Sequence, residues 1–481
     1  MKNLIYIIFL FLSISVFLSC EDKDDFSSDS NLNIEFSSDT IRFDTVFTSF
    51  GSSTRKMKIY NRNKNSLVIN SIELMNPEQS GFRIMVPPYS GNSVNNVEIL
   101  KKDSVYIYIE VTVDPQNSNS PILIQDSIRL QYNGNTQYIQ LEAYGQDAFI
   151  WRGKTIEQDT TLTGEKPILI FDSLVVNKEA KLSIEPNTRM FFHKNAGVKV
   201  YGTIDARGTL NQPIVMRGDR TDNIFTKVPY DRVPGQWNGM TVDSLSFNNH
   251  FEYFHLRNSI QGIMFKTSNL SQKKATFINS IIHNTTSDGV SAENCQIEGY
   301  NSQFTNAGGS VLKLIGGDYY FLHCTLANNI SPRWGVRINT ALLIGNYSDD
   351  KETRPLIRGE FINSIISESG SSAVKEQKSD NSGIPYNRSF RNCLVKAKGG
   401  KDDEIDKNNI WNEDPVFVYV SNKKLDYYYN FELDSISPAK NVADKVFSIS
   451  LPLDIKGESR LGDDGPDIGC YEWIPTQTGI Q

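Results

Sequence analysis

Two groups of charged side chains in this chain have the residue types that act as general acids and bases. They are Asp205 and Arg207 together with Arg217 and Asp219, and Asp288 together with His283. Elimination needs carboxylates that hold calcium, or another way to neutralise a uronate, and an arginine or lysine as the base. Hydrolysis needs two carboxylates at a set separation. Because each residue is explained more simply as a solvated turn or an outward strand position, the sequence assigns no catalytic residue.

Three aspartates near the C-terminus have a spacing that fits either a calcium loop or a structural turn. They are Asp463, Asp464 and Asp467, in the segment LGDDGPDIG. The chain has no CxxC or HExxH motif and its histidines are scattered, so a zinc site has no support. We therefore expect no cofactor and leave only calcium open, at these aspartates.

Aromatic side chains give a further signal, since flat rings can stack on the faces of sugars. The candidates lie near expected corners or inserted loops, and they are Tyr319, Tyr320, Phe321, Trp334 and Tyr427, Tyr428 and Tyr429. Filling of the core by alternating aromatic side chains is the alternative. Both interpretations stay open from the sequence.

A repeat indicates which elements position these residues. Ser280, Ser302 and Cys324 are 22 residues apart, and an apolar residue lies two positions before and two positions after each of them. The pattern returns at Ser364 and Cys393, after 40 and 29 residues, which indicates inserted loops. Such a period predicts a solenoid in which each coil of strands stacks on the last.

Side chains alternate along a strand, so offsets of minus two, zero and plus two are expected to share the inward face. This register places Phe304 inward, and it places Gln303 and His323 outward. An asparagine follows four residues after each small residue, as Asn284, Asn306 and Asn328. Asparagine tolerates left-handed backbone angles, and stacked amides can bond to one another, so these three predict a structural ladder at one corner.

The N-terminus indicates where the protein is located. Residues 4–18 are almost wholly apolar, and Ser19 and Cys20 precede an acidic run. Residues 1–19 read as a signal peptide. The junction resembles a bacterial lipobox, which implies lipidation at Cys20, and the acidic run resembles the export signals of surface lipoproteins of Bacteroidota. The resemblance implies a membrane partner through the lipid, and surface exposure on the outer membrane. Residues 20–34, acidic and serine-rich, are expected to be a tether.

Residues 35–147 contain short alternating strands, with Asn133 and Gly134 as a two-residue hairpin turn. This pattern is typical of a β-sandwich. The stretch from FDTVFTSFGSS to LEAYGQDA resembles the immunoglobulin-like domains of bacterial surface proteins related to the ASH and major-sperm-protein group. The resemblance implies a spacer or docking domain.

Residues 151–405 are expected to form the solenoid. The segment VYGTIDARGTLNQPIVMRGDR resembles the opening turns of right-handed parallel β-helix proteins of the pectate-lyase-like superfamily, and DGPDIGCYEW resembles the closing segment of many surface β-helix proteins. Residues 406–481 are accordingly the expected closing segment. The overall fold class expected is all-β, with an immunoglobulin-like sandwich followed by a right-handed parallel β-helix.

The net charge of −7 does not indicate a basic surface of the kind that binds nucleic acid, so nucleic acid is not an expected partner. The expected function is a lipid-anchored cell-envelope protein that acts as a non-catalytic binding, adhesion or structural module, with a glycan or an envelope protein as its partner. The alternative is a polysaccharide lyase or a glycoside hydrolase, since many members of the pectate-lyase-like superfamily cleave polysaccharides. One fold hosts many functions, so the choice depends on the side chains of neighbouring coils.

Overall fold

The computed structural model describes residues 25–225, 227–336, 339–370, 372–398, 405–420 and 425–475. Cys20 and the expected signal peptide lie outside the described residues. The chain divides into two compact units, Met1–Asp147 and Ala148–Gln481. Within the described ranges, no helix is both long and apolar enough to span a membrane. The structure is nearly all β, with long parallel sheets in the second unit.

The first unit is a β-sandwich of two sheets. One sheet has the strand order β1 (Ile34–Phe36), β3 (Arg55–Asn61), β8 (Ser104–Val111), β5 (Phe82–Val86) and β6 (Tyr89–Gly91). The other has the order β2 (Thr40–Phe47), β10 (Asn135–Gln146), β9 (Ile122–Tyr132), β4 (Leu67–Leu74) and β7 (Ser93–Ile99), and the short helix α2 (Pro77–Ser80) follows β4. Inward side chains of both sheets, such as Ile59 and Ile128, form one buried cluster. The alternation of apolar and polar residues therefore folds as expected.

The described part of the expected tether is attached to this sandwich. The Ser27 N–H donates to the Ser66 carbonyl at 2.9 Å. Asn133 Nδ2, in the turn between β9 and β10, donates to the carbonyls of Ser27 and Asp29 at 3.1 and 3.0 Å. Residues 25–33 thus run along the domain rather than lying free of it.

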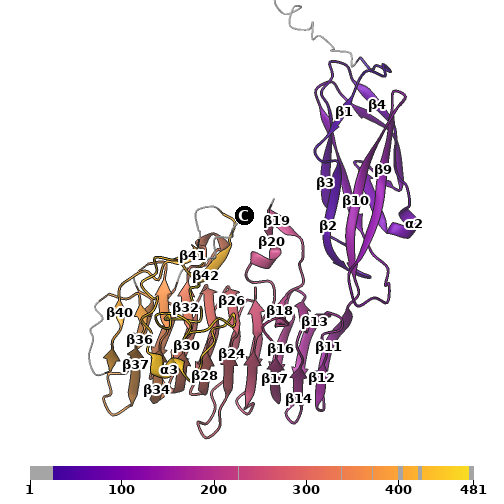
Figure 1. Cartoon of the computed structure of the whole chain (residues 1–481). Coiled ribbons are helices and arrows are strands. Elements are labelled where there is room, and N and C mark those ends of the chain that lie inside the picture. Colours follow the sequence, from indigo (N-terminus) through magenta and orange to yellow (C-terminus); the bar gives the residue numbers. More distant parts are fainter. Residues whose placement is uncertain are drawn as a thin grey trace, which may run out of the picture. The chain divides into compact units, whose positions relative to one another are not determined.

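The second unit is a stack of coils whose strands pair in parallel with those of neighbouring coils (Figure 1). The larger sheet contains two series of paired strands that meet at β13. One series pairs in the order β11 (Phe149–Ile156), β13 (Ile168–Val176), β15 (Arg189–Phe192), β18 (Ile214–Gly218), β23 (Phe254–Arg257), β26 (Ile281–Thr285), β29 (Gln303–Ala307), β32 (Thr325–Asn328), β35 (Ile365–Glu368), β38 (Leu394–Val395) and β40 (Ile410–Trp411). The other pairs in the order β13, β16 (Gly197–Val200), β21 (Met240–Val242), β24 (Ile263–Phe265), β27 (Val290–Glu293), β30 (Leu312–Ile315), β33 (Leu342–Gly345) and β36 (Val374–Gln377).

The smaller sheet of the coils consists of β12 (Thr160–Leu162), β14 (Lys181–Ile184), β17 (Thr203–Arg207), β22 (Asn249–Glu252), β25 (Ala275–Ile278), β28 (Gln296–Tyr300), β31 (Gly317–Leu322), β34 (Leu356–Ile362), β37 (Tyr386–Arg391) and β39 (Asp406–Lys407). Further elements project from the coils, namely β19 (Asn223–Phe225), β20 (Val228–Pro229), η1 (Tyr230–Arg232), η2 (Pro332–Trp334), and the hairpin of β41 (Phe417–Val420) and β42 (Tyr429–Leu433). The coils enclose one continuous apolar core.

The repeat read from the sequence is the register of the coils. Ile282 pairs with Phe304, Phe304 with Leu326, Leu326 with Ile366 and Ile366 with Val395. The offsets of 22, 40 and 29 residues are thus the spacings at which the strands pair. The small residues of the repeat, including Cys324 and Cys393, are fully buried.

The expectation for the residue two positions before the small residue was wrong. Ile278 and Tyr300 are only partly buried, and Leu322 is buried but lies outside the core of the coils. The inward position of these strands is one residue earlier, at Phe277 and Phe321. The intervening residue has a positive φ in each coil, which turns the chain between two strands and breaks the alternation. These corner residues are Asn279, Asn301, His323, Asn363 and Asn392, with φ between 46° and 51°.

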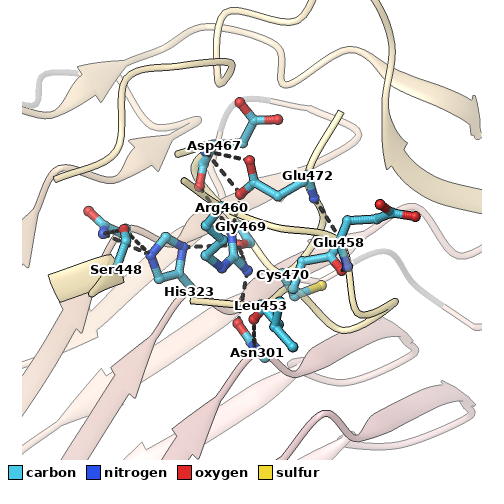
Figure 2. Close-up of polar contacts among 12 residues, drawn as sticks. Asn301, His323, Ser448, Leu453, Glu458, Arg460, Asp467, Gly469, Cys470 and Glu472 are labelled. Atoms are coloured by element: carbon cyan, nitrogen blue, oxygen red, sulfur yellow. Dashed lines mark hydrogen bonds and ion pairs between the residues drawn. The ribbon is translucent and has the colours of Figure 1, made fainter. Parts of the chain in front are cut away.

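The C-terminal strap (residues 434–475, with the short helix α3, Lys445–Ser448) lies over the outer face of several coils. Its apolar side chains pack on outward residues of the larger sheet such as Ile365 and Leu394. Arg460, fully buried, forms an ion pair with Glu472 and donates to Asn301 Oδ1 at 2.8 Å (Figure 2). The strap is therefore bound to the coils by a buried polar network as well as by apolar contacts.

The strap covers two side chains that point outward from the coils, as expected. His323 is fully buried, and its imidazole contacts Ser448 Oγ at 2.8 Å and the Gly469 carbonyl at 3.3 Å (Figure 2). Gln303 points out of the coil but is 6% exposed, because Tyr471 of the strap donates to its Oε1 at 2.7 Å. An outward position is solvent-exposed only where no later segment covers it.

Candidate ligand-binding groove

The outer face of β24, β27 and β30 carries a groove of about 500 Å³. Met264, Ser291 and Lys313 occupy matching positions on these consecutive strands and all point outward, because their neighbours on either side face the core. Gln261 and Asp288, in the turns before β24 and β27, line the same groove. Its volume is within the range typical of small-ligand sites.

Most charged side chains of the groove are neutralised by a neighbour. Lys313 Nζ lies 2.6 Å from Asp349, and Lys266 Nζ lies 3.1 Å from Asp243. Glu293 accepts from Arg354 Nε at 3.0 Å. These pairs leave the groove with little net charge and with several oriented hydrogen-bonding groups.

Asp288 differs from the other carboxyl groups of the groove, since no ion pair joins it to a cation in the described residues. Its Oδ1 accepts from the Ser310 N–H at 2.7 Å. Burial raises the pKa of Asp288, and the Ser310 hydrogen bond and the Lys313 charge oppose only part of this increase.

Gln261 and Met264 complete the lining. Gln261 Nε2 donates to the Asp288 carbonyl at 3.2 Å and to Ser291 Oγ at 3.3 Å. The Met264 side chain is 37% exposed beside them, so an apolar surface adjoins the polar groups. Together these side chains could hold the hydroxyl groups and one apolar face of a sugar ring.

The structure does not bring His283 to Asp288. His283, on β26, contacts Thr305 Oγ1 through Nδ1 at 2.8 Å, and its ring centre is 6.0 Å from that of Tyr429. Burial, together with the nearby charge of Arg257, lowers the pKa of His283 to about 4. This imidazole is therefore neutral at pH 7.

The candidates near Arg217 form an arginine cluster (Arg217, Asp231, Arg257) on another face. Asp231, from η1, accepts from Arg257 at 2.7 and 3.1 Å and lies 2.9 Å from Arg217 Nη1. Burial lowers the pKa of Arg217 to about 10, although Asp231 opposes the change. Arg217 also donates to two carbonyls, so it attaches the β19–η1 insertion to the coils. Asp219 is paired separately, with His193 at 2.6 Å.

Asp205 and Arg207 lie in a second groove, of about 430 Å³, on the smaller sheet. Asp205 is paired with Lys181 at 2.6 Å and with Arg207 at 2.7 Å. Arg207 lies 3.8 Å from Glu252, which itself lies 3.2 Å from His250. This ladder of alternating charges joins successive coils, and each carboxylate in it has a basic partner.

The three C-terminal aspartates do not converge. Asp463 and Asp464 are exposed, whereas Asp467 is 1% exposed and accepts from the N–H groups of Asn441 and Trp473 at 2.7 and 2.6 Å. Among the residues that the structure describes, no group of three His, Cys, Asp or Glu side chains could hold a metal ion. Asp467 organises the main chain of the strap.

Three of the seven candidate aromatic side chains are buried inside the protein. Tyr319 and Phe321 belong to the core, and Tyr427 is 9% exposed and packs on Trp334 with ring centres 4.3 Å apart. Tyr320 and Tyr429 are half-buried. Tyr428, 46% exposed, is covered on one side by Arg232. These rings form no row along the coils.

The asparagine ladder is only partly a ladder of amides. Asn284 Nδ2 donates to Asn258 Oδ1 at 2.9 Å, and both Asn284 and Asn306 have a positive φ. Asn328 instead donates to main-chain carbonyls, including that of Ala307 at 2.9 Å. The sequence reasoning missed the second asparagine column, at the corner before each small residue. The recurring pairs Asn-Ser and Asn-Cys of the repeat were its signal.

Comparisons with known proteins give distant likenesses. No family model matches the chain, and no curated protein matches it. The catalytic domain of a GH87 α-1,3-glucanase is similar over 73% of this chain and 80% of that chain, with 10% identity and a TM-score of 0.20. A family 123 glycoside hydrolase from Clostridium perfringens (10% identity, TM-score 0.18) is similar over 25% of this chain, and the matched part spans 30% of that chain. An ASH/PapD-like domain of human CEP192 is similar over 24% and 85%, with 10% identity and a TM-score of 0.18. At these TM-scores no activity is transferred to this chain.

Proposed function

We propose that this protein is a lipid-anchored envelope module that binds a glycan, without cleaving it, in the groove of β24, β27 and β30. The observation that carries the proposal is the chemistry of the lining. Lys266, Glu293 and Lys313 are each neutralised by a partner, while Gln261 and Asp288 offer hydrogen-bonding groups beside the apolar Met264. A concave site with apolar surface and a few polar groups is the usual form of a small-ligand site.

The proposal also includes the finer fold and the location. The N-terminal sandwich is taken as immunoglobulin-like and the coils as a right-handed parallel β-helix, supported by the two five-stranded sheets and by the parallel pairing of the coils. Lipidation at Cys20 and exposure on the outer membrane are supported by the lipobox-like sequence. Adhesion and a purely structural role are then different uses of the same anchored solenoid.

The test of binding uses a groove-filling substitution. Ser291→Trp places a large ring in the groove at an outward position, so it should weaken binding of a recognised neutral polysaccharide at least about tenfold, or about 1.4 kcal/mol. Thr276→Trp, outward on β25 in the other groove, is the matched control. A panel of neutral and uronate-containing polysaccharides is screened by calorimetry. Equal affinities of the two variants would place the glycan elsewhere.

A second candidate function is glycoside hydrolysis, and one observation favours it. Asp288 has a raised pKa, and Glu293 in the same groove is a carboxylate paired with Arg354. Two carboxyl groups with contrasting environments are what an acid and a base need. Asp288 would protonate the leaving oxygen, and Glu293 would take a proton from the attacking water. New reducing ends that form with the wild type, and not with Asp288→Asn, would decide for this activity over binding alone.

A further inference from the structure

The outer face of the β1-β3-β8-β5-β6 sheet places lysine amines next to tyrosine rings. Lys56 and Lys58 alternate with buried residues on β3, so both point outward. In the register of β3 with β8, Lys56 is opposite Tyr108 and Lys58 is opposite Tyr106. Lys58 Nζ lies 4.7 Å from the centre of the Tyr106 ring, and Lys56 Nζ lies 5.8 Å from it.

The two lysines carry charge that the rest of this face does not cancel. No ion pair joins Lys56 or Lys58 to a carboxylate in the portion of the chain that the structure describes. Of the other cations on this face, Arg62 lies 3.5 Å from Glu35, and Arg83, opposite Glu110 in the strand register, donates to Thr112 Oγ1 at 2.9 Å. A local excess of positive charge therefore stands on a protein whose net charge is −7. Tyrosine rings hold the amines in place and do not neutralise them.

A groove of about 390 Å³ adjoins the lysines on the same sheet. Tyr108 lies between Lys56 on β3 and Met85 on β5, and Met85 is 41% exposed. Ser90 and Asn92 supply hydrogen-bonding groups, and Arg83 and Glu110 add one positive and one negative charge to the same lining. The face thus offers an apolar surface and polar groups for one ring of a ligand, next to two ammonium groups for its negative charges.

We infer that this face binds an acidic polysaccharide, with its carboxylates at Lys56 and Lys58 and one of its sugar rings in the groove at Tyr108 and Met85. Charge complementarity selects an anionic partner, because the amines are positioned and unpaired. The adjoining groove selects a polymer of rings over an anionic membrane, since lipid headgroups need charge but no concave site beside it. This site is separate from the groove of the solenoid and does not depend on the function proposed for it.

The experiment measures binding of the full chain to polygalacturonate and, as a neutral comparison, to its fully methyl-esterified form. The double substitution Lys56→Glu and Lys58→Glu should weaken binding of polygalacturonate about tenfold or more, because it removes two ion pairs with the polymer and replaces each by a repulsion. Binding by the wild type should also weaken with salt. Lys178→Glu, at an exposed position of the second unit, is the matched control and should bind as the wild type does.

Three results would overturn the inference. In the first, the double variant binds polygalacturonate as tightly as Lys178→Glu does. In the second, the wild type binds the esterified polymer as tightly as polygalacturonate. In the third, the wild type binds vesicles of phosphatidylglycerol through these lysines but does not bind polygalacturonate. Circular dichroism melting checks that the double variant is folded, and the double substitution of both lysines to Gln provides a milder loss of charge. Ser291→Trp, in the groove of β24, β27 and β30, should leave binding of polygalacturonate unchanged. The two sites can therefore be tested independently of each other.

Discussion

Replacing Arg460 by Met should release the strap from the coils. The guanidinium is fully buried, and it bonds to Glu472, Asn301 Oδ1 and the Gly469 carbonyl. Where the remaining partner is ionised, removing one partner of a buried ion pair costs about 3–5 kcal/mol, because that charge is left buried without compensation; for Glu472 this applies in full above about pH 8. Asn301 and Gly469 each lose a hydrogen bond as well. The lost free energy destabilises the strap and not the coils, so the strap should open locally before the coils unfold.

The thiol of Cys470 reports this opening directly. Cys470 is fully buried in the strap and its N–H donates to Thr325 Oγ1, so its thiol can be labelled only when the strap opens. At tenfold per 1.4 kcal/mol, Arg460→Met should accelerate labelling by about two to three and a half orders of magnitude. A Cys470→Ser background subtracts any labelling elsewhere, and Arg333→Met, at an exposed arginine, is the control.

The pH dependence gives the same prediction a second test. Burial raises the pKa of Glu472 to about 8, and the Asp467 carboxylate adds to the increase while Arg460 opposes it. A carboxyl whose pKa is raised on folding stabilises the fold at low pH, and this contribution is lost as the pH rises through the folded pKa. Without Arg460, the loss should therefore be larger at about pH 9 than at about pH 5. Labelling that accelerates less than about fivefold, with no dependence on pH, would refute the account of the strap.

Four further predictions concern the coils, their contacts with the strap and the anchor. Phe304→Ala should cost about 3–5 kcal/mol of unfolding free energy in denaturant titrations, because Phe304 is fully buried in the core column; a loss below about 1 kcal/mol would contradict the register. Gln303→Ala should cost about 1–2 kcal/mol, since it leaves the Tyr471 hydroxyl without its partner. Burial, reinforced by the charge of Arg460, lowers the pKa of His323 well below its usual value. The wild type should therefore lose up to about 1.4 kcal/mol of unfolding free energy per pH unit below about pH 6.5, and His323→Asn should lose less in the same melting series. Parallel stability curves for the two proteins would contradict this. Cys20→Ser should move the protein from the membrane fraction to the soluble fraction, and equal incorporation of a fatty-acid label in both forms would count against lipidation at Cys20.

The sequence by itself determined the coil register. Period and side-chain type in Ser280, Ser302 and Cys324 are local properties, and stacking identical positions is the way in which each coil buries its apolar face. The same reasoning placed Phe304 correctly and Ile278 incorrectly. The difference is the left-handed corner at Asn279, whose backbone angle interrupts the alternation on which the assignment depended.

Only the tertiary structure decided which outward side chains meet solvent and which meet one another. Gln303 and His323 point out of their coils, yet residues more than 120 positions later cover them. Asp288 joins Met264 and Lys313 in one groove because three coils stack, whereas His283, five residues from Asp288, faces a different surface. Sequence patterns record the neighbours along a strand, but contacts between coils and with the strap depend on loop lengths and on the path of the chain, which no local pattern encodes.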